Sequence, residues 1–302
     1  MNVWTSFTMD CENLDSLSGV GGVSDWAFSA RSIRGFADRL EAAGHLATLF
    51  LCPETAVAHR GWLRDLESRG HELAMHFHPD SFSDGRARGL GQLGQYVGKV
   101  QREMLTEGLA VWADALGKKP ATFRPGCLSA NDETFQILVD LGFTQGSVSS
   151  PGRNEPVLSA IWQPPLLDAH LASAAQRSLS GDLDFVEIPL SVDWEVRFPH
   201  RFGWDLPQEL MIERGDTQTL TGIISKHVKR FAEQKKQVPT ICAATHNVWD
   251  FSDAEEEKTQ ILLSLLESME RLQQSEDVRF IGATIASIAD QYRRSHTDVT
   301  DP

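Results

Sequence analysis

The sequence predicts an α/β fold in which strands interleaved with helices form a closed or nearly closed barrel. Short apolar runs alternate along the 302 residues with longer amphipathic stretches, and this alternation is typical of βα units. Four of the apolar runs also end in polar side chains that can bind a metal or exchange protons. An open, doubly wound sheet is the competing architecture, but the phosphate-binding pattern G-x-G-x-x-G is missing after the first predicted strand.

The individual elements follow from the period of the apolar residues. Strands are predicted over 2–9, 46–52, 71–77, 121–124, 144–149, 185–190, 239–245 and 278–282. Helices are predicted over 29–43, 55–69, 92–116, 131–141, 217–235, 253–273 and 284–293. Start signals support several helices: Ser29 precedes the first helical period, and Asn131-Asp132-Glu133 makes a first turn acidic. Glycines follow four of the predicted helix ends, at Gly44, Gly70, Gly117 and Gly142.

Two stretches have no firm period. Residues 150–184 are rich in Pro, Ser and Ala, and we expect a long irregular insertion there. Residues 196–215 are expected to be a second insertion or loop. Because strands and helices interleave on both sides of these stretches, residues 1–302 are predicted to form one barrel domain rather than two unrelated ones.

Composition excludes several classes of partner. The formal net charge of -14 argues against nucleic acid or an anionic membrane, since both bind basic surfaces. No stretch reaches the roughly 18 apolar residues of a membrane span, and the start of the sequence has no secretory pattern. Four cysteines without a C-x-x-C pair indicate reduced thiols. We therefore expect a cytoplasmic protein that acts on a small molecule or carbohydrate, and a homo-oligomer is compatible with the sequence.

The first candidate site residues lie at the end of the first predicted strand. Asp10 and Glu12 point to one side of a strand and Cys11 to the other, because strand side chains alternate. The two carboxylates, roughly 7 Å apart along the backbone, can converge on one ion. Alternatively, one binds the ion and the other remains free as a general base. The ordinary alternative is that the two carboxylates stabilise the start of the next helix through its dipole, or form salt bridges in a loop.

A histidine pair with the same spacing ends the third predicted strand. His76 and His78 face one way, and Asp80 follows Pro79 closely enough to supply an oxygen instead. Imidazole and carboxylate are common ligands of Zn²⁺, which is the favoured ion, with Co²⁺, Ni²⁺ and Fe²⁺ as alternatives. The earlier His71, close after a helix end, is expected to be structural.

Three further segments add groups that fit hydrolysis. Arg124 ends a short strand before Pro125-Gly126, and an arginine near carboxylates keeps a base ionised. His246 ends the run from Ile241 to Thr245, and histidine suits protonation of a leaving amine. Asn247 follows it and is counted with the substrate-binding residues. Asp193-Trp194 offers a carboxylate and a flat aromatic face for a sugar.

In order and content, these segments resemble the polysaccharide deacetylase family, also called carbohydrate esterase family 4. Thr8-Met9-Asp10 matches its T-x-D element, Gly70 to His76 its G-H-E-φ-x-x-H element, and Phe123-Arg124-Pro125 its F-R-P element. His246 matches the histidine that ends a late strand. The resemblance covers about residues 2 to 290 and implies a distorted (β/α)7-type barrel with metal-dependent hydrolysis of an N-acyl group.

The resemblance also implies roles for six residues: Asp10 as base, Arg124 as positioning arginine, His76 as first metal histidine, His246 as general acid, Asp193 as partner carboxylate and Trp194 as pocket wall. The chain departs from the family pattern at two positions. Cys11 replaces the second of two adjacent aspartates, so that Glu12 is the expected metal carboxylate. Asp80 replaces the second histidine, so that either His78 or Asp80 is the third ligand.

Our leading hypothesis is a metal-dependent deacetylase or amidohydrolase that acts on a carbon–nitrogen bond other than a peptide bond. The two departures motivate an alternative from another class, a catalytically impaired barrel that binds a saccharide. A glycosidase with two carboxylates ranks last, because it leaves His76, His78 and Arg124 without a shared purpose. A cysteine nucleophile is not favoured, since Cys11 faces away from Asp10.

Overall fold

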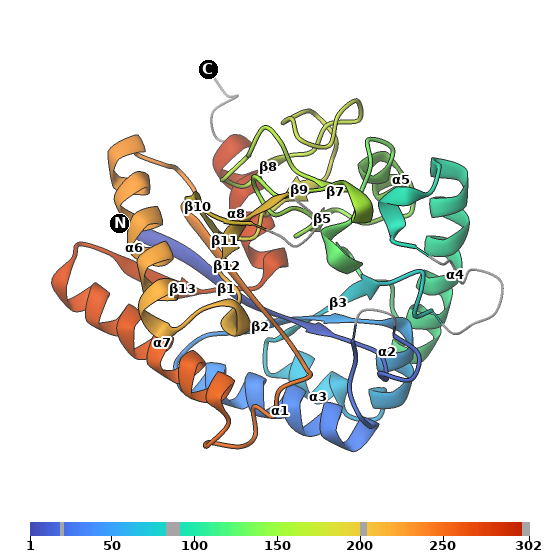
Figure 1. The fold of residues 1–302 in the computed structure, drawn as a ribbon, viewed down its shortest axis with the longest axis horizontal. Coiled ribbons are helices and arrows are strands. Elements are labelled where there is room, and N and C mark those ends of the chain that lie inside the picture. Colours follow the sequence, from blue (N-terminus) through green and yellow to red (C-terminus); the bar gives the residue numbers. More distant parts are fainter. Residues whose placement is uncertain (19–20, 83–90, 200–203, 298–302) are drawn as a thin grey trace.

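The computed structural model describes residues 1–18, 21–82, 91–199 and 204–297 (Figure 1). Its central strand, β1 (Asn2–Cys11), pairs in parallel with β12 (Thr240–His246) on one side and β2 (Ala47–Leu51) on the other. Parallel pairing then continues through β3 (Glu72–Phe77), β4 (Thr122–Pro125), β5 (Gln145–Gly146) and β9 (Val186–Glu187). In the described residues, these strands form a parallel sheet of seven.

The sheet curls into a nearly closed barrel. Between β9 and β12 irregular backbone replaces a strand: the Ser191 N–H donates to the Cys242 carbonyl at 2.9 Å, and Met211 forms a parallel bridge with Ala244. At the edges, β8 (His170–Leu171) pairs antiparallel with β9, and β13 (Arg279–Gly282) pairs with the start of β1. This arrangement confirms the predicted distorted barrel and excludes the open sheet.

Helices cover the outside of the sheet (Figure 1). They are α1 (Trp26–Ala42), α2 (Pro53–His59), α3 (Leu63–Ser68), α4 (Gly98–Leu116), α5 (Thr134–Asp140), α6 (Thr217–Gln234) and α7 (Glu257–Ser275). The last helix is α8 (Ile285–Thr297), whose apolar residues belong to a different cluster. Alternating strand residues separate two apolar clusters: Leu49 and Leu51 belong to the larger one, and Phe50 belongs to the smaller. Among the described residues, no helix is long and apolar enough to cross a bilayer.

Helix α8 closes the amino end of the barrel. Its Ile285 N–H donates to Thr48 Oγ1, and its Ala286 N–H donates to the half-buried Glu72 carboxylate, both at 3.0 Å. Thr48 and Glu72 stand at the starts of β2 and β3. The carboxyl ends of the strands are therefore the end of the barrel that is left for a site.

Three sequence-based boundaries need correction. The helix predicted over 55–69 is two helices, broken around Gly61, which disfavours helix. The helix predicted over 92–116 begins at Gly98, after a short 3₁₀ turn η1 (Leu93–Gln95). The predicted insertion at 150–184 is largely irregular, with short pieces β6 (Asn154–Glu155), η3 (Pro156–Leu158) and β7 (Ala160–Ile161) besides β8.

The stretch at 196–215, which was expected to be an insertion or loop, contains regular strands. Strands β10 (Val192–Pro199) and β11 (Asp205–Glu209) form an antiparallel hairpin, although residues 200–203 lie outside the described part. Its register shifts between Asp193 and Arg197, and this irregularity interrupts the alternation by which a strand is recognised. The 3₁₀ turn η4 (Ile212–Arg214) follows.

Candidate metal centre and active site

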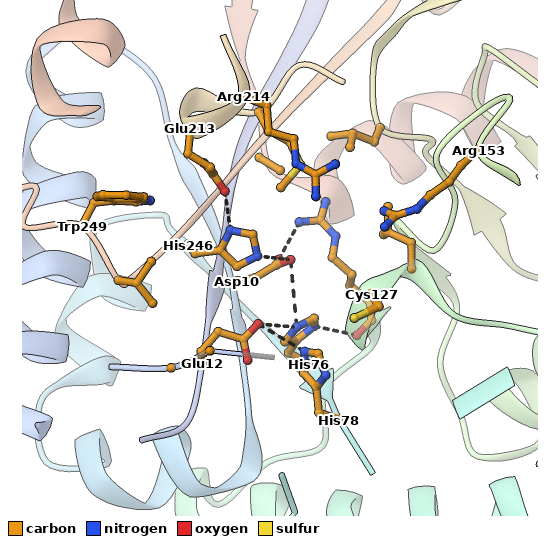
Figure 2. A pocket seen from close by; sticks show the side chains of 18 residues that line it. Asp10, Glu12, His76, His78, Cys127, Arg153, Glu213, Arg214, His246 and Trp249 are labelled. Atoms are coloured by element: carbon orange, nitrogen blue, oxygen red, sulfur yellow. Dashed lines mark hydrogen bonds and ion pairs between the residues drawn. The ribbon is translucent and has the colours of Figure 1, made fainter. Parts of the chain in front are cut away.

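Six of the ten predicted site residues line one cavity of about 470 Å³ at the carboxyl ends of the parallel strands (Figure 2). They are Asp10, Glu12, His76, His78, Arg124 and His246. Asp10 comes from β1, His76 from β3, Arg124 from β4 and His246 from β12. The barrel therefore brings together side chains that are as much as 236 positions apart in the sequence.

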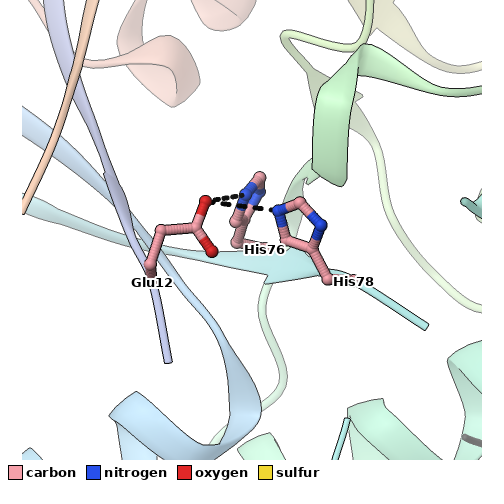
Figure 3. A group of neighbouring side chains, drawn as sticks. All are labelled: Glu12, His76 and His78. Carbon is pink, nitrogen blue, oxygen red and sulfur yellow. Dashed lines mark hydrogen bonds and ion pairs between the residues drawn. The ribbon is translucent and has the colours of Figure 1, made fainter. Parts of the chain in front are cut away.

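Glu12, His76 and His78 form a candidate metal centre (Figure 3). One ligand atom from each lies within 4.8 Å of the other two, and all three residues are buried. Glu12 Oε1 lies 3.3 Å from His76 Nε2 and 3.2 Å from His78 Nε2. Burial by itself raises the pKa of Glu12, but His78 and His76 outweigh burial and hold that pKa well below its usual range. An ionised carboxylate thus faces two imidazoles.

The hydrogen bonds around this group fit a bound divalent ion. His76 Nδ1 donates to the Arg124 carbonyl at 2.9 Å, which leaves Nε2, the nitrogen that points at Glu12, as the one that could bind an ion. Such an outer hydrogen bond is the usual support of a metal-binding histidine. The ring of His78 packs on Gly126, where an added Cβ would lie 2.2 Å from Nδ1. A buried carboxylate and two imidazoles with this spacing could hold a metal ion.

Asp80 lies on the other side of His78 from this group. Its Oδ1 is 3.7 Å from His78 Nδ1, and its Oδ2 accepts a hydrogen bond of 2.9 Å from Gln92. Of the two alternatives left by the sequence, the geometry groups His78 with Glu12 and His76. Asp80 lies near the other nitrogen of His78, but neither its Oδ1 nor His78 Nδ1 has a hydrogen-bond partner among the described residues.

Asp10 is held between Arg124, His76 and His246. Its Oδ1 accepts from Arg124 Nη1 at 2.7 Å, and its Oδ2 lies 4.0 Å from His76 Nε2 and 3.9 Å from His246 Nε2. Burial raises the pKa of Asp10, but the charge of Arg124, with smaller contributions from His76 and His246, lowers it overall. Asp10 is consequently an ionised carboxylate with one oxygen facing the cavity.

The guanidinium of Arg124 is buried and fixed from several sides. It donates to Thr8 Oγ1 at 2.8 Å, to Ser147 Oγ at 2.9 Å and to the Ser147 carbonyl at 3.1 Å. It also lies over the ring of Phe50, 4.2 Å from the centroid. Its planar fork therefore holds Asp10 in one orientation.

His246 has a carboxylate partner that the sequence analysis missed. Its Nδ1 donates to Glu213 of η4, and its Nε2 faces Asp10 (Figure 2). Burial lowers the pKa of His246, but Glu213 outweighs it, with help from Asp10, and raises the pKa to about 9. The imidazole is therefore protonated at neutral pH and presents an acidic N–H to the cavity.

The remaining cavity wall also escaped the sequence analysis. Arg153, Arg214 and Trp249 line it, together with the backbone after Gly126. The sequence did contain one signal for Arg214. Glu213-Arg214 follows the apolar run Leu210-Met211-Ile212, and the predicted site segments likewise have polar residues directly after an apolar run. The run is only three residues long and falls in a stretch expected to be a loop.

Asp193 and Trp194 are not among the residues that line the cavity. Asp193 pairs with Lys226 of α6, and the Trp194 ring stands edge-on to His227, with 5.3 Å between centroids. The hairpin register turns both side chains toward the helix. Glu187 is another buried carboxylate near Arg124. Burial raises its pKa to about 7, opposed by hydrogen bonds from Ser149 and the Val148 N–H and, less strongly, by the charge of Arg124.

Asn247 is buried beneath the cavity and is not part of its lining. Its Oδ1 accepts from the Glu12 N–H at 2.9 Å, and its Nδ2 donates to Ser29 Oγ at 2.9 Å. Ser29 Oγ in turn lies 2.9 Å from His59 Nε2. Asn247 thus fixes the backbone of a candidate metal ligand, whereas the sequence analysis had placed it against substrate.

The cysteines are unsuited to nucleophilic attack. Cys11, Cys52 and Cys242 are buried, and burial raises the pKa of each thiol. Cys127 lines the cavity, but burial raises its pKa to about 12. Cys11 lies in the apolar core, on the opposite side of β1 from Asp10, as the strand alternation predicts.

Fold and site together define an α/β barrel with a candidate metal centre at the carboxyl ends of its strands, and this fold is shared with solved polysaccharide deacetylases. A protein from Mycobacterium smegmatis, provisionally described as a polysaccharide deacetylase, is 17% identical with a TM-score of 0.61; the match covers 97% of this chain and 91% of that one. A protein from Pseudomonas aeruginosa PAO1 with the same provisional description is 15% identical, with a TM-score of 0.57 and coverages of 97% and 92%.

A third similar structure is the Puue allantoinase, at 14% identity and a TM-score of 0.57, with coverages of 97% of this chain and 91% of that one. No family model matches the sequence, and no curated protein matches it either. The structural matches confirm the resemblance found in the sequence at the level of the fold.

Proposed function

We propose that this chain is a metal-dependent hydrolase that removes an N-acyl group, with acetyl the first to test, from a sugar or related amide. The observation that carries the proposal is the position of Asp10. Its free oxygen lies about equally far from His76 of the candidate metal centre and from the protonated His246. A base, an acid and a metal site around one cavity are the components of metal-assisted amide hydrolysis.

The residues divide this chemistry among them. Glu12, His76 and His78 would hold the ion, which when bound polarises the amide carbonyl and lowers the pKa of water. Asp10, oriented by Arg124, takes the proton of the attacking water on its free oxygen. His246, oriented by Glu213, donates its Nε2 proton to the departing nitrogen.

Other observations support a hydrolase. The structures with the same fold bear the names polysaccharide deacetylase and allantoinase. The alternative of a non-catalytic saccharide-binding barrel rested on the replacement of two family residues, by Cys11 and Asp80. Glu12 and His78 nevertheless group with His76, which supports an intact ligand set.

The first experiment measures metal content by elemental analysis in protein purified without chelator or added metal, beside a His76→Ala variant. About one transition-metal equivalent in the wild type, lost in the variant, is the expected result. No metal in the wild type, even after reconstitution with Zn²⁺ or Co²⁺, would contradict the proposal.

The second experiment tests the base. Asp10→Asn keeps the shape of the side chain but removes the group that accepts the proton. We expect it to retain the ion while turnover of N-acetyl sugars or cyclic amides falls by about 100-fold or more. Retained turnover would refute the role of Asp10.

A further inference from the structure

The wall of the cavity carries an arginine pair that the proposed hydrolysis does not use. We propose that Arg214 and Arg153 bind an anionic group of the substrate, a carboxylate or a phosphate, beside the reacting amide. This inference rests on the proposed function and names the substrate class of the same site. In Figure 2 the two arginines lie on one side of Asp10 and His246, and Trp249 lies on the other.

A single buried carboxylate holds both arginines at the cavity. Glu209 is fully buried; its Oε1 accepts from Arg153 Nη1 at 3.3 Å, and its Oε2 pairs with Arg214 Nη1. Ser150 donates to the same Oε1 at 2.7 Å, and Glu155 binds the other end of Arg153 at 2.7 Å. One carboxylate thus holds both guanidiniums at the cavity wall, and such preorganisation favours binding of an anion beside them.

The pair has donors to spare. A guanidinium carries five N–H groups, and in the described part of the chain Arg214 makes one ion pair, through Nη1. The Arg214 side chain is 40% exposed, so its remaining N–H groups are accessible from the cavity. Arg153 is 7% exposed and bonds through Nε, Nη1 and Nη2. Arg214 is therefore the principal recognition group, and Arg153 supports it by holding the shared Glu209 in place.

The position of Arg214 couples recognition to chemistry. It directly follows Glu213, the residue that orients His246, in the same short turn η4. An anion bound by Arg214 would therefore lie close to the acid that protonates the leaving nitrogen. Trp249 supplies a flat wall, and its indole N–H is buried without a partner among the described residues. The cavity fits a ring that carries both an acylamino group and an anionic substituent.

A purely structural network is the competing explanation, because the same ion pairs tie residues 150–155 to β11. The two explanations differ at Arg214, which has a single ion pair and is substantially exposed. A structural arginine of that kind contributes little, whereas loss of a charge-assisted hydrogen bond to a substrate anion costs about tenfold or more in affinity.

The test compares three substrates in the metal-loaded enzyme: N-acetylglucosamine, its 6-phosphate, and N-acetylmuramic acid, which carries a carboxylate. Kinetics are measured for the wild type and Arg214→Gln. Arg102→Gln is the matched control, because Arg102 is 44% exposed and, within the described residues, makes one ion pair, with Asp140, away from the cavity. We expect the wild type to prefer an anionic sugar, and the ratio of kcat/KM for anionic over neutral substrate to fall about tenfold in Arg214→Gln through KM.

The anionic sugar that the wild type prefers identifies the source of the charge as phosphate or carboxylate. Preference for the neutral sugar, an unchanged ratio in Arg214→Gln, or an equal loss in Arg102→Gln would overturn the inference. Calorimetric binding of the same three sugars to Asp10→Asn separates this result from failure of the proposed hydrolysis. If Asp10→Asn binds an anionic sugar more tightly than the neutral one, and the double variant with Arg214→Gln loses this difference, the subsite is supported even without turnover. Equal or undetectable binding of all three sugars overturns the inference.

Discussion

Replacing Glu213 by glutamine removes the negative charge that keeps His246 protonated. The pKa of His246 is raised from 6.5 to about 9, a change that corresponds to about 3 kcal/mol in favour of the protonated imidazole. Burial opposes this change, and Glu213 is the largest of the contributions that produce it. A neutral glutamine can still accept the hydrogen bond from Nδ1, so the substitution tests charge more than shape.

We expect the pKa of His246 in Glu213→Gln to fall to about 7, because Asp10 and Glu12 still favour the protonated form. At pH 8 the imidazole would then be about 90% protonated in the wild type and about 10% in the variant. Activity that requires this proton should fall about tenfold at pH 8 but less than about twofold at pH 6.

The pKa is measured without any substrate by NMR titration of the imidazole resonances, assigned with a His246→Gln variant. Glu41→Gln is the control, since Glu41 lies 3.7 Å from a different histidine, His71, and should leave His246 unchanged. A pKa near 6.5 in the wild type, or one near 9 that persists in Glu213→Gln, would refute the assignment of His246 as an acid held protonated by Glu213.

Two further substitutions test how the metal centre is built. Asn247→Ala removes the acceptor of the Glu12 N–H, and we expect Zn²⁺ affinity measured by calorimetry to fall about 10- to 100-fold; unchanged affinity would refute this positioning role. Gly126→Ala places a Cβ 2.2 Å from the His78 ring and should lower both Zn²⁺ affinity and the free energy of unfolding, the latter by about 1–3 kcal/mol. The control is Gly222→Ala, where the added Cβ meets no atom within 4 Å apart from its own helix backbone and chain neighbours, and calorimetric melting should show no loss of stability.

Much of the barrel could be predicted from local patterns. A run such as β1 is recognisable because alternation and β-branched or aromatic residues are properties of neighbouring positions. The same alternation places Asp10 and Glu12 on one side and Cys11 on the other, and it gives His76 and His78 a common direction. The predicted site residues that line the cavity therefore lie at or just after the ends of regular strands.

Residues on irregular backbone were the ones that sequence reasoning missed. Glu213 and Arg214 belong to a three-residue turn after an irregular hairpin, and Arg153 belongs to the insertion. Such segments have no period from which a direction can be predicted. Conversely, Asp193 and Trp194 lie on a strand with a register shift, and they pack on α6 instead of reaching the cavity.

The sequence by itself determined the order of the parallel strands along the chain and the chemical groups at their ends, because both depend on neighbouring residues. Only the tertiary structure decided which groups meet. Asn247 reaches Glu12 across 235 positions, and Glu213 reaches His246 across 33. Whether His78 or Asp80 faces Glu12 likewise depends on how the strands pair around the barrel. These contacts follow from the curl and closure of the sheet, which no local pattern encodes.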